Sequence, residues 1–174
     1  MRLIASADLN WGIGMDGKLL YRTSADMLRL RKMTMGQVLL MGGRTFRGLP
    51  NGALPGRVNV VLSRDSGLRN EKAGICVAGN PDEALLILAQ YPDKEHLLFG
   101  GGEIYRIFLP YCTRADITRY AHTRQADTFL PRLDETPGWV LAAKSPAQEE
   151  NGLWFWYETW AFSLQTSFDY AKIY

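Results

Sequence analysis

Short apolar segments alternate with stretches of helical character along most of the chain. The apolar segments span residues 3–7, 38–41, 58–62, 75–77, 97–99 and 117–120. Helices are expected over 24–34, 81–90 and 102–108, with Ser24 as the N-cap of the first and Pro81 in the first turn of the second. This alternation of strands and helices is typical of an α/β fold.

The C-terminal part of the chain has a different pattern. An apolar segment at 139–143, a polar one at 144–152 and an aromatic-rich one at 153–162 are typical of a hairpin that closes a sheet edge. We therefore predict a mixed, mainly parallel sheet with an antiparallel edge, flanked by helices, in one domain over 1–162. Residues 163–174 follow as a tail for which the sequence predicts no element.

The composition favours a soluble globular protein. The chain has 174 residues, of which 47% are hydrophobic and 22% charged, and its formal charge is +2. No basic tail is present, so we expect neither a nucleic acid nor a membrane as partner. The two cysteines and two histidines lack metal-ligand spacing, and no segment resembles a signal peptide or a membrane span. These features favour a cytoplasmic protein without a metal.

The run from Gly12 to Gly17 matches the letters of a dinucleotide-binding fingerprint, G-x-G-x-x-G. That fingerprint must open a helix, and here no helix start occurs before Ser24. We therefore interpret the run as a mobile loop with a turn at Asp16-Gly17. The alternative that this loop folds back over a binding site is left open.

Glycines and basic residues follow three predicted strands where each strand ends. A tight turn or a solvated arginine would explain any one of these sites alone. Together they favour a nucleotide crevice, because ligands of open α/β sheets bind outside the carboxyl ends of the strands, where glycine lets backbone N–H groups approach a phosphate. The residues concerned are Gly42, Gly43, Arg44, Thr45, Ser63, Arg64, Gly100, Gly101 and Gly102.

Asp26 lies on the apolar face of the predicted helix 24–34. At about 100° per residue, Leu30 and Met33 flank it, whereas Arg29 and other basic residues are expected mostly elsewhere. A desolvated carboxylate needs hydrogen-bond donors or a raised pKa, which makes Asp26 a functional candidate. The alternative is that this carboxylate only serves the helix dipole near the N-terminus.

A set of short segments keeps a common order and spacing over most of the chain. The set comprises Leu3-Ile4-Ala5, Gly12-Ile13-Gly14, Gly17, Asp26, Thr34, Met41-Gly42, Thr45-Phe46, Leu54-Pro55-Gly56-Arg57, Leu62-Ser63-Arg64, Gly100-Gly101-Gly102, Tyr105 and Asp127-Thr128. It resembles the dihydrofolate reductase family, closely over 3–64, well over 97–131 and weakly over the final hairpin. The resemblance implies an eight-stranded mixed sheet that binds NADPH at the strand ends and a dihydropterin against the helix carrying Asp26.

The resemblance also implies roles for individual residues. Asp26 would pair with N3 and the 2-amino group of the pteridine, Thr118 would support that contact through a water, and Tyr21 belongs to the same catalytic set. Arg57 would hold the α-carboxylate of the glutamate tail. The other substrate-binding residues would be Ile4, Ala5, Met27, Leu30 and Leu54. The cofactor-binding residues would be Ser6, Ile13, Gly14, Gly43, Arg44, Thr45, Leu62, Ser63, Arg64, Gly100, Gly101, Gly102 and Tyr105.

Several positions depart from the family's usual residues. Leu20-Tyr21 replaces Pro-Trp, Leu30 replaces an aromatic residue, Gly43 replaces an arginine, and Glu103 stands where a basic residue is common. We expect a changed substrate wall, a looser glycine loop and Arg44 in compensation for the missing arginine.

The resulting expectation is a monomeric enzyme that reduces 7,8-dihydrofolate with NADPH, by hydride transfer to C6 and protonation of N5. Antifolates would then bind it as well. One alternative is a reductase of a related pterin or riboflavin-pathway pyrimidine. Another is a catalytically silent NADP-binding paralogue.

Overall fold

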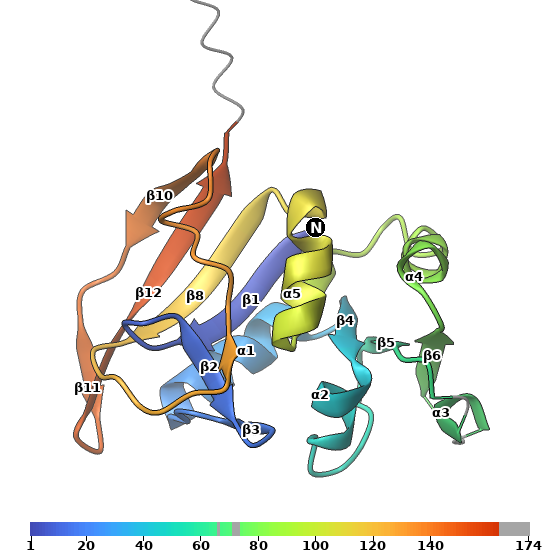
Figure 1. The fold of residues 1–174 in the computed structure, drawn as a ribbon, viewed down its shortest axis with the longest axis horizontal. Helices are drawn as coiled ribbons and strands as arrows, with labels where there is room; N and C mark the ends of the chain where they lie inside the picture. The colour runs from blue at the N-terminus through green and yellow to red at the C-terminus, as the bar shows by residue number, and fades with distance from the viewer. Residues whose placement is uncertain (66, 71–73, 164–174) are drawn as a thin grey trace, which may run out of the picture.

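The core of the protein is a sheet whose strands follow the order β10-β12-β8-β1-β7-β4-β5-β6 (Figure 1). The computed structural model describes residues 1–65, 67–70 and 74–163. The six strands from β8 to β6 are parallel, and β12 and β10 add an antiparallel edge that also pairs with β11 (Gln148–Glu150). The predicted mixed sheet with its edge hairpin is confirmed. The strands are β1 (Arg2–Ala7), β4 (Val38–Gly42), β5 (Val58–Leu62), β6 (Ile75–Ala78), β7 (His96–Gly100), β8 (Arg114–Tyr120), β10 (Trp139–Lys144) and β12 (Leu153–Phe162).

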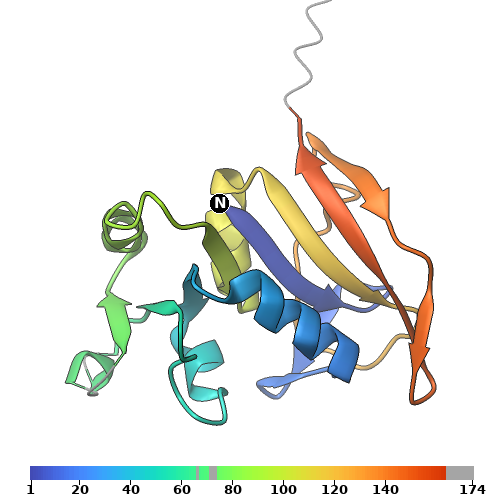
Figure 2. The same cartoon turned by 180° about the vertical axis from the view of Figure 1, so that it is seen from behind.

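Helices cover both faces of this sheet. On one face, α1 lies across the strands, toward the viewer in Figure 2, and packs with α2 and α3 on a cluster that contains Leu39, Met41 and Val61. On the other face, α4 and α5 pack on a larger cluster around Leu3, Leu40 and Leu98. Successive strand residues point to opposite faces, so one strand supplies both clusters. The helices are α1 (Ser24–Thr34), α2 (Gly43–Arg47), α3 (Gly67–Asn70), α4 (Pro81–Leu88) and α5 (Gly102–Phe108), followed by a 3-10 turn at Leu109–Tyr111.

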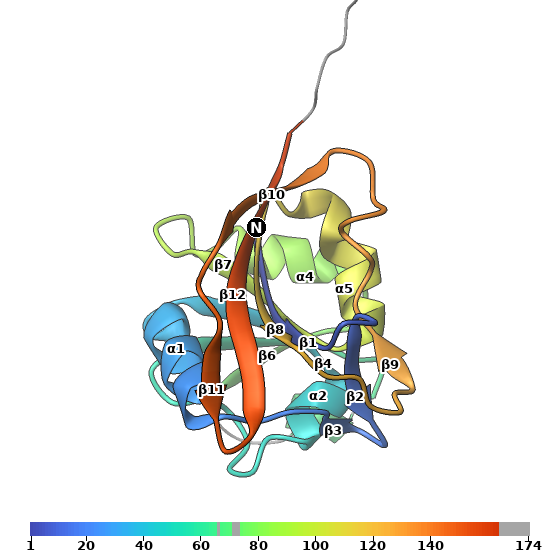
Figure 3. The same cartoon turned by 90° about the vertical axis from the view of Figure 1, so that its left-hand side faces the viewer.

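The glycine run at 12–17 forms part of a second, three-stranded sheet with the order β3-β2-β9 (Figure 3). The strands are β2 (Gly12–Met15), β3 (Lys18–Leu19) and β9 (Thr128–Phe129). The predicted turn is present, since Asp16 and Gly17 both have positive φ, at 50° and 73°, as a two-residue hairpin requires. The prediction of a loop around it was wrong, because the pairing of β2 with the distant β9 leaves no local signal.

Three predicted boundaries shift in the structure. The N-cap of α1 is Thr23 rather than Ser24: its hydroxyl accepts from the Asp26 N–H at 3.3 Å and bonds to the Tyr120 hydroxyl at 2.9 Å. The strand predicted at 117–120 begins at Arg114, where charged side chains that pair with one another hide the apolar pattern. The helix expected to reach Gln90 ends at Leu88.

Ser163 is the last residue of the C-terminal tail within the described part of the chain, and the remainder of the predicted tail lies outside it. Among the described residues, no helix is long and apolar enough to cross a membrane. The cysteines Cys76 and Cys112 are free thiols.

Candidate active site

Asp26 of α1 contacts the central strand β8 directly. Its carboxylate Oδ1 accepts a hydrogen bond from the Thr118 hydroxyl at 2.6 Å, and the residue is only 6% exposed. Thr118 lies opposite Ser6 of β1 in the sheet register. The resemblance implied a contact through a water, and the structure adds this direct bond between the two side chains.

The start of α1 does not depend on the Asp26 carboxylate. Thr23 caps the backbone N–H of Asp26, and the carboxylate of Glu150 accepts from the N–H groups of Ser24 at 2.6 Å and Ala25 at 3.0 Å. A cap and a neighbouring acid thus satisfy the first-turn donors and complement the helix dipole. Thr23 and Glu150 therefore fill the role at the helix start that the alternative interpretation gives to the Asp26 side chain.

Burial controls the ionisation of Asp26. Desolvation raises the pKa of its carboxyl group, while the Thr118 hydrogen bond and the positive charge of Arg29 lower it, and the net direction is upward. No described residue donates to its second oxygen, Oδ2. Such a carboxylate can accept hydrogen bonds from two neighbouring donors of a ligand and can exchange a proton with them.

Arg29 is a site residue that the sequence pattern missed. It was expected to lie away from Asp26, yet its Nη1 donates to Thr118 Oγ1 at 3.4 Å and its Nη2 to Asp116 Oδ1 at 3.3 Å. Its guanidinium lies 4.3 Å from the centre of the Tyr157 ring. The spacing of three residues from Asp26 was the available signal, because residues i and i+3 are neighbours on a helix surface.

Replacing Arg29 by methionine is expected to raise the pKa of Asp26 further, because this removes a positive charge that favours the carboxylate. The measurement is a pH titration of the Asp26 side-chain carbon by NMR on the protein without ligands. Arg114→Met is the matched control, because Arg114 also bonds Asp116 but does not contact Thr118. Equal titration midpoints in the parent and the Arg29 variant would contradict the assignment.

Residues predicted to line the substrate pocket gather on the α1 face of the sheet. Ile4 is buried in the cluster of that face, and Leu30 and Leu54 pack against it. Leu54 is held in place by Asn59, whose side chain bonds both its N–H and its carbonyl at 3.0 Å. Sequence reasoning missed Asn59 because a polar residue inside an apolar strand gives no sign of its partner. Met27 is partly buried on α1. Ala5 packs against the cluster of the opposite face, because successive residues of β1 alternate between the two faces, so the structure does not bring its side chain together with the others.

Arg57 lies beside the C-terminal end of α1. Its guanidinium donates to Thr34 Oγ1, to the Pro55 carbonyl at 2.7 Å and to the Arg31 carbonyl. Among the described residues it has no carboxylate partner, and burial together with the nearby Arg31 charge lowers its pKa. A partly buried cation that is held only by neutral acceptors is suited to receive a carboxylate.

Tyr21 lies in a separate aromatic group. It is buried, its ring stacks on Tyr120 at 4.6 Å between centroids, and the Arg124 guanidinium covers it at 4.4 Å. Its hydroxyl has no hydrogen-bond partner within the described residues. The structure therefore does not bring Tyr21 into contact with Asp26, and its catalytic role stays a prediction.

The ends of β4, β5 and β7 bring the predicted cofactor residues together. A Cβ on Gly43 would lie 2.9 Å from Ser63 Oγ, and one on Gly101 would lie 3.2 Å from Thr45 Oγ1. A larger residue at position 43 would therefore require the Ser63 side chain to shift. Arg44 and Arg64 are exposed at the same edge, while Leu62 is partly buried at the end of β5. The predicted convergence of three strand ends is therefore present in the fold.

The remaining predicted cofactor residues lie next to this edge, on β1, β2, β7 and α5. The buried Tyr105 donates its hydroxyl to the Ile4 carbonyl at 2.7 Å and packs against Gly100. A Cβ on Gly102 would meet the Phe129 carbonyl at 3.0 Å, which brings β9 close to α5. Ile13 and Gly14 are buried on β2, and Ser6 is partly buried on β1.

Comparisons with known proteins agree with this geometry. The family model "Dihydrofolate reductase" matches residues 1–161. A dihydrofolate reductase of Mycobacterium leprae is 39% identical over 133 residues, covering 74% of this chain and 77% of its own. A type 3 dihydrofolate reductase of Salmonella typhimurium is 34% identical over 151 residues, with coverages of 86% and 90%.

A solved structure is similar over nearly the whole fold. The dihydrofolate reductase from Enterococcus faecalis, complexed with NADP(H) and RAB-propyl, has a TM-score of 0.79 and 26% identity, and the match covers 92% of this chain and 95% of that one. The match of the family model to most of the chain, together with this structural similarity, shows that the chain belongs to the dihydrofolate reductase family.

Proposed function

We propose that the protein reduces 7,8-dihydrofolate to 5,6,7,8-tetrahydrofolate with NADPH. A hydride is added at C6 and a proton at N5, and NADP⁺ is released. The observation that carries the proposal is that α1 has the buried Asp26–Thr118 contact near its start and Arg57, which has no carboxylate partner among the described residues, beside its C-terminal end. A folate has a donor-rich pterin at one end and a carboxylate at the other.

The protein's own residues bind, orient and shield the reactants. Asp26 would accept from N3 and the 2-amino group of the pterin through its two oxygens, held in place by Thr118. Ile4, Leu30 and Leu54 would form the apolar walls that exclude water, and Arg57 would fix the glutamate tail. An ionised carboxylate at this position favours the protonated, more electrophilic pterin.

The strand-end edge fits a phosphorylated dinucleotide. Gly43 and Gly101 have no side chain that would keep a phosphate away from their backbone N–H groups, and Arg44 and Arg64 offer two exposed cations. NADPH supplies the hydride when it is bound there.

NADPH is expected to be preferred to NADH, because an arginine stays charged at all relevant pH values and can hold a 2′-phosphate. Replacing Arg44 and Arg64 together by alanine should lower the ratio of kcat/KM with NADPH to kcat/KM with NADH by about tenfold or more. A tenfold change in this ratio corresponds to about 1.4 kcal/mol. The measurement is kcat/KM for both cofactors in the parent and the variant. The KM for dihydrofolate serves as the internal control and should change little. Comparable kcat/KM values for both cofactors in the parent would contradict the assignment.

Initial rates with different substrates test the proposed function. Purified protein is mixed with NADPH and either dihydrofolate, a dihydropterin without a glutamate tail, or a riboflavin-pathway pyrimidine, and the nicotinamide absorbance is followed. The proposal requires dihydrofolate to have the highest kcat/KM. A higher value for the pyrimidine would favour the related reductase, and binding of NADPH without any oxidation would favour a silent paralogue.

We further propose that the enzyme acts as a monomer in the cytoplasm and that residues 1–162 form its catalytic domain. The two free cysteines support a reducing compartment. Sedimentation of the purified protein tests the monomer.

A further inference from the structure

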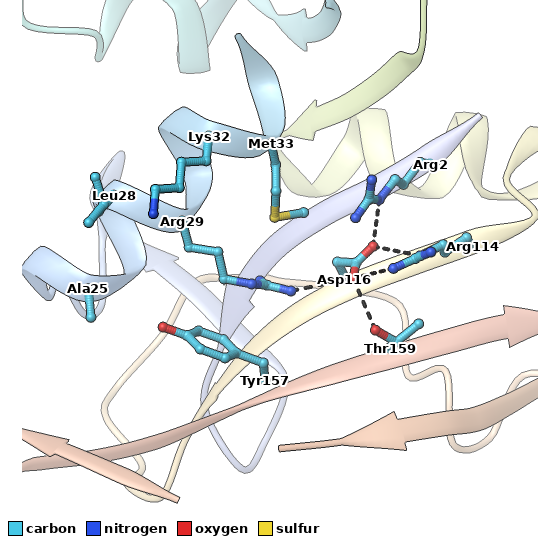
Figure 4. Close-up of a pocket in the computed structure, with 10 residues that line it drawn as sticks. All are labelled: Arg2, Ala25, Leu28, Arg29, Lys32, Met33, Arg114, Asp116, Tyr157 and Thr159. Atoms are coloured by element: carbon cyan, nitrogen blue, oxygen red, sulfur yellow. Dashed lines mark hydrogen bonds and ion pairs between the residues drawn. The ribbon is translucent and has the colours of Figure 1, made fainter. Parts of the chain in front are cut away.

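Asp116 of β8 binds three arginines next to the contact between α1 and the sheet, as Figure 4 shows. Its side chain is only 2% exposed and lies on the same face of β8 as Thr118, two residues further along the strand. It accepts hydrogen bonds from Arg2 Nε at 2.6 Å, Arg114 Nε at 3.0 Å and Arg29 Nη2 at 3.3 Å. The proposed reaction gives this carboxylate no role, because neither substrate nor cofactor is expected to touch it.

Arg29 connects this carboxylate to the Asp26 site. Its Nη1 donates to Thr118 Oγ1 at 3.4 Å, and the same hydroxyl donates to Asp26 Oδ1 at 2.6 Å. The Tyr157 ring packs against its guanidinium, 4.3 Å from the ring centre. Within the described part of the chain, Arg29 forms an ion pair with Asp116 but none with Asp26. Since a single hydroxyl oxygen lies between Arg29 and Asp26, a small rotation of the arginine side chain would bring the two charges into contact.

The three arginines differ in what they can bind besides the carboxylate on β8. Arg2 also pairs with Glu95 at 3.2 Å, and Arg114 is half exposed, so water can hydrate its charge. Burial lowers the pKa of the Arg29 guanidinium, and the carboxylates on β8 and of Asp26 raise it. Without its partner on β8, Arg29 would therefore be drawn to Asp26, because a partly buried cation needs an anionic partner.

An ion pair between Arg29 and Asp26 would compete with the substrate. The proposed function needs both oxygens of the Asp26 carboxylate to accept from N3 and the 2-amino group of the pterin. A guanidinium also offers two parallel N–H donors that fit the two oxygens of one carboxylate. The arginine and the pterin would thus occupy the same two oxygens and exclude each other.

We infer that Asp116 is a positioning residue for the proposed reaction: it holds the Arg29 guanidinium against Thr118 and so keeps the Asp26 carboxylate free for the pterin. The inference rests on the proposed function through the role of Asp26. Asp116 itself acts only through Arg29, whose charge stays near Asp26 without covering its oxygens.

The other ionisable groups near Asp26 keep a constant charge between pH 5 and 8. Burial raises the pKa of Tyr157, and it raises that of Tyr120 to about 12, so both tyrosines stay neutral. Hydrogen bonds from the N–H groups at the start of α1 lower the pKa of Glu150, which stays ionised. Burial raises the pKa of Asp116, but its arginine partners lower it by more, so it is ionised too. A changed Asp26 titration in a variant therefore reports where the arginine lies.

Variants at positions 29 and 116 test the inference on the protein without ligands. In Asp116→Asn, Arg29 is expected to pair with Asp26, which should lower the pKa of Asp26 by about one pH unit. In the Arg29→Met background, the same substitution should leave the pKa of Asp26 unchanged, because no cation remains to move. The measurement is an NMR titration of the Asp26 side-chain carbon, and thermal unfolding confirms that each variant is folded.

Glu158→Gln is the matched control. It removes another buried carboxylate of the sheet, ion-paired with Arg119 at 3.6 Å on the opposite face, and should leave the Asp26 titration unchanged. Arg114→Met/Asp116→Asn removes one cation together with the carboxylate and carries the same expectation as Asp116→Asn. This second variant decides the question if excess positive charge prevents the single variant from folding.

The KM for dihydrofolate is the second readout. It should rise by about tenfold in Asp116→Asn, and in the double variant it should stay at the Arg29→Met value, while the KM for NADPH does not change. An unchanged Asp26 titration in Asp116→Asn, the same shift after Arg29 is replaced, or an unchanged KM for dihydrofolate would overturn the inference. A parent protein that does not reduce dihydrofolate would contradict the proposed function instead, and the titration would still show whether Asp116 holds Arg29 away from Asp26.

Discussion

Replacing Asp26 by asparagine is expected to slow hydride transfer by roughly 10²-fold or more at neutral pH, in line with typical acid–base contributions. The asparagine keeps the shape of the side chain and an oxygen for the Thr118 hydroxyl, but it removes the negative charge. The loss should shrink as the pH falls, because protons from solution then protonate the pterin that Asp26 otherwise helps to protonate. The measurement is pre-steady-state oxidation of NADPH with saturating dihydrofolate between pH 5 and 8.

The stability of the same variant separates this result from misfolding. Burial raises the pKa of Asp26 in the folded state, so the parent loses stability as the pH rises from the unfolded pKa through the folded one. Asparagine does not ionise and escapes this loss. At neutral pH the variant should therefore unfold at the same or a higher temperature than the parent. Near-parental rates at pH 7 in a folded variant would contradict the catalytic assignment of Asp26.

Replacing Arg57 by methionine is expected to raise the KM for dihydrofolate by about 10- to 100-fold, because a hydrogen bond to a charged group contributes about 1.5–3 kcal/mol. The KM for NADPH and the rate at saturating dihydrofolate should change much less. Arg31→Met is the matched control, because it removes a positive charge next to Arg57 but keeps the Arg31 backbone carbonyl that Arg57 bonds.

A substrate without the glutamate tail provides the second half of this test. If Arg57 binds the carboxylate, parent and variant should use a dihydropterin without the tail equally well. An Arg57 variant that loses the same factor with both substrates would show that this residue supports the fold of the site rather than the tail.

The main sheet could be predicted from the sequence because its strands are short apolar runs bounded by glycines and polar turns. The small sheet could not, since β2 and β9 pair across most of the chain and each is too short to show a period. The cap of α1 was misplaced by one residue because Thr23 and Ser24 both suit the position. The Tyr120 hydroxyl, which comes from a distant strand, holds Thr23 there.

The functional residues divide in the same way. Asp26 and the strand-end glycines stand out in the sequence. A carboxylate on the apolar face of a helix, or several glycines directly after a strand, is not what the packing of a core alone would require. Arg29 and Asn59 do not stand out, because their roles depend on partners in other elements: Thr118 and Asp116 for Arg29, and the Leu54 backbone for Asn59. A charged residue in the middle of a helix is otherwise typical of a solvated surface.

The most direct test of the proposed reaction is a single turnover of the parent protein. Protein in excess is loaded with NADPH and mixed with less than one equivalent of dihydrofolate, and both nicotinamide absorbance and the folate product are followed. The account predicts that each dihydrofolate consumed oxidises one NADPH and yields one tetrahydrofolate. Unchanged NADPH in a folded protein that binds both molecules would contradict it.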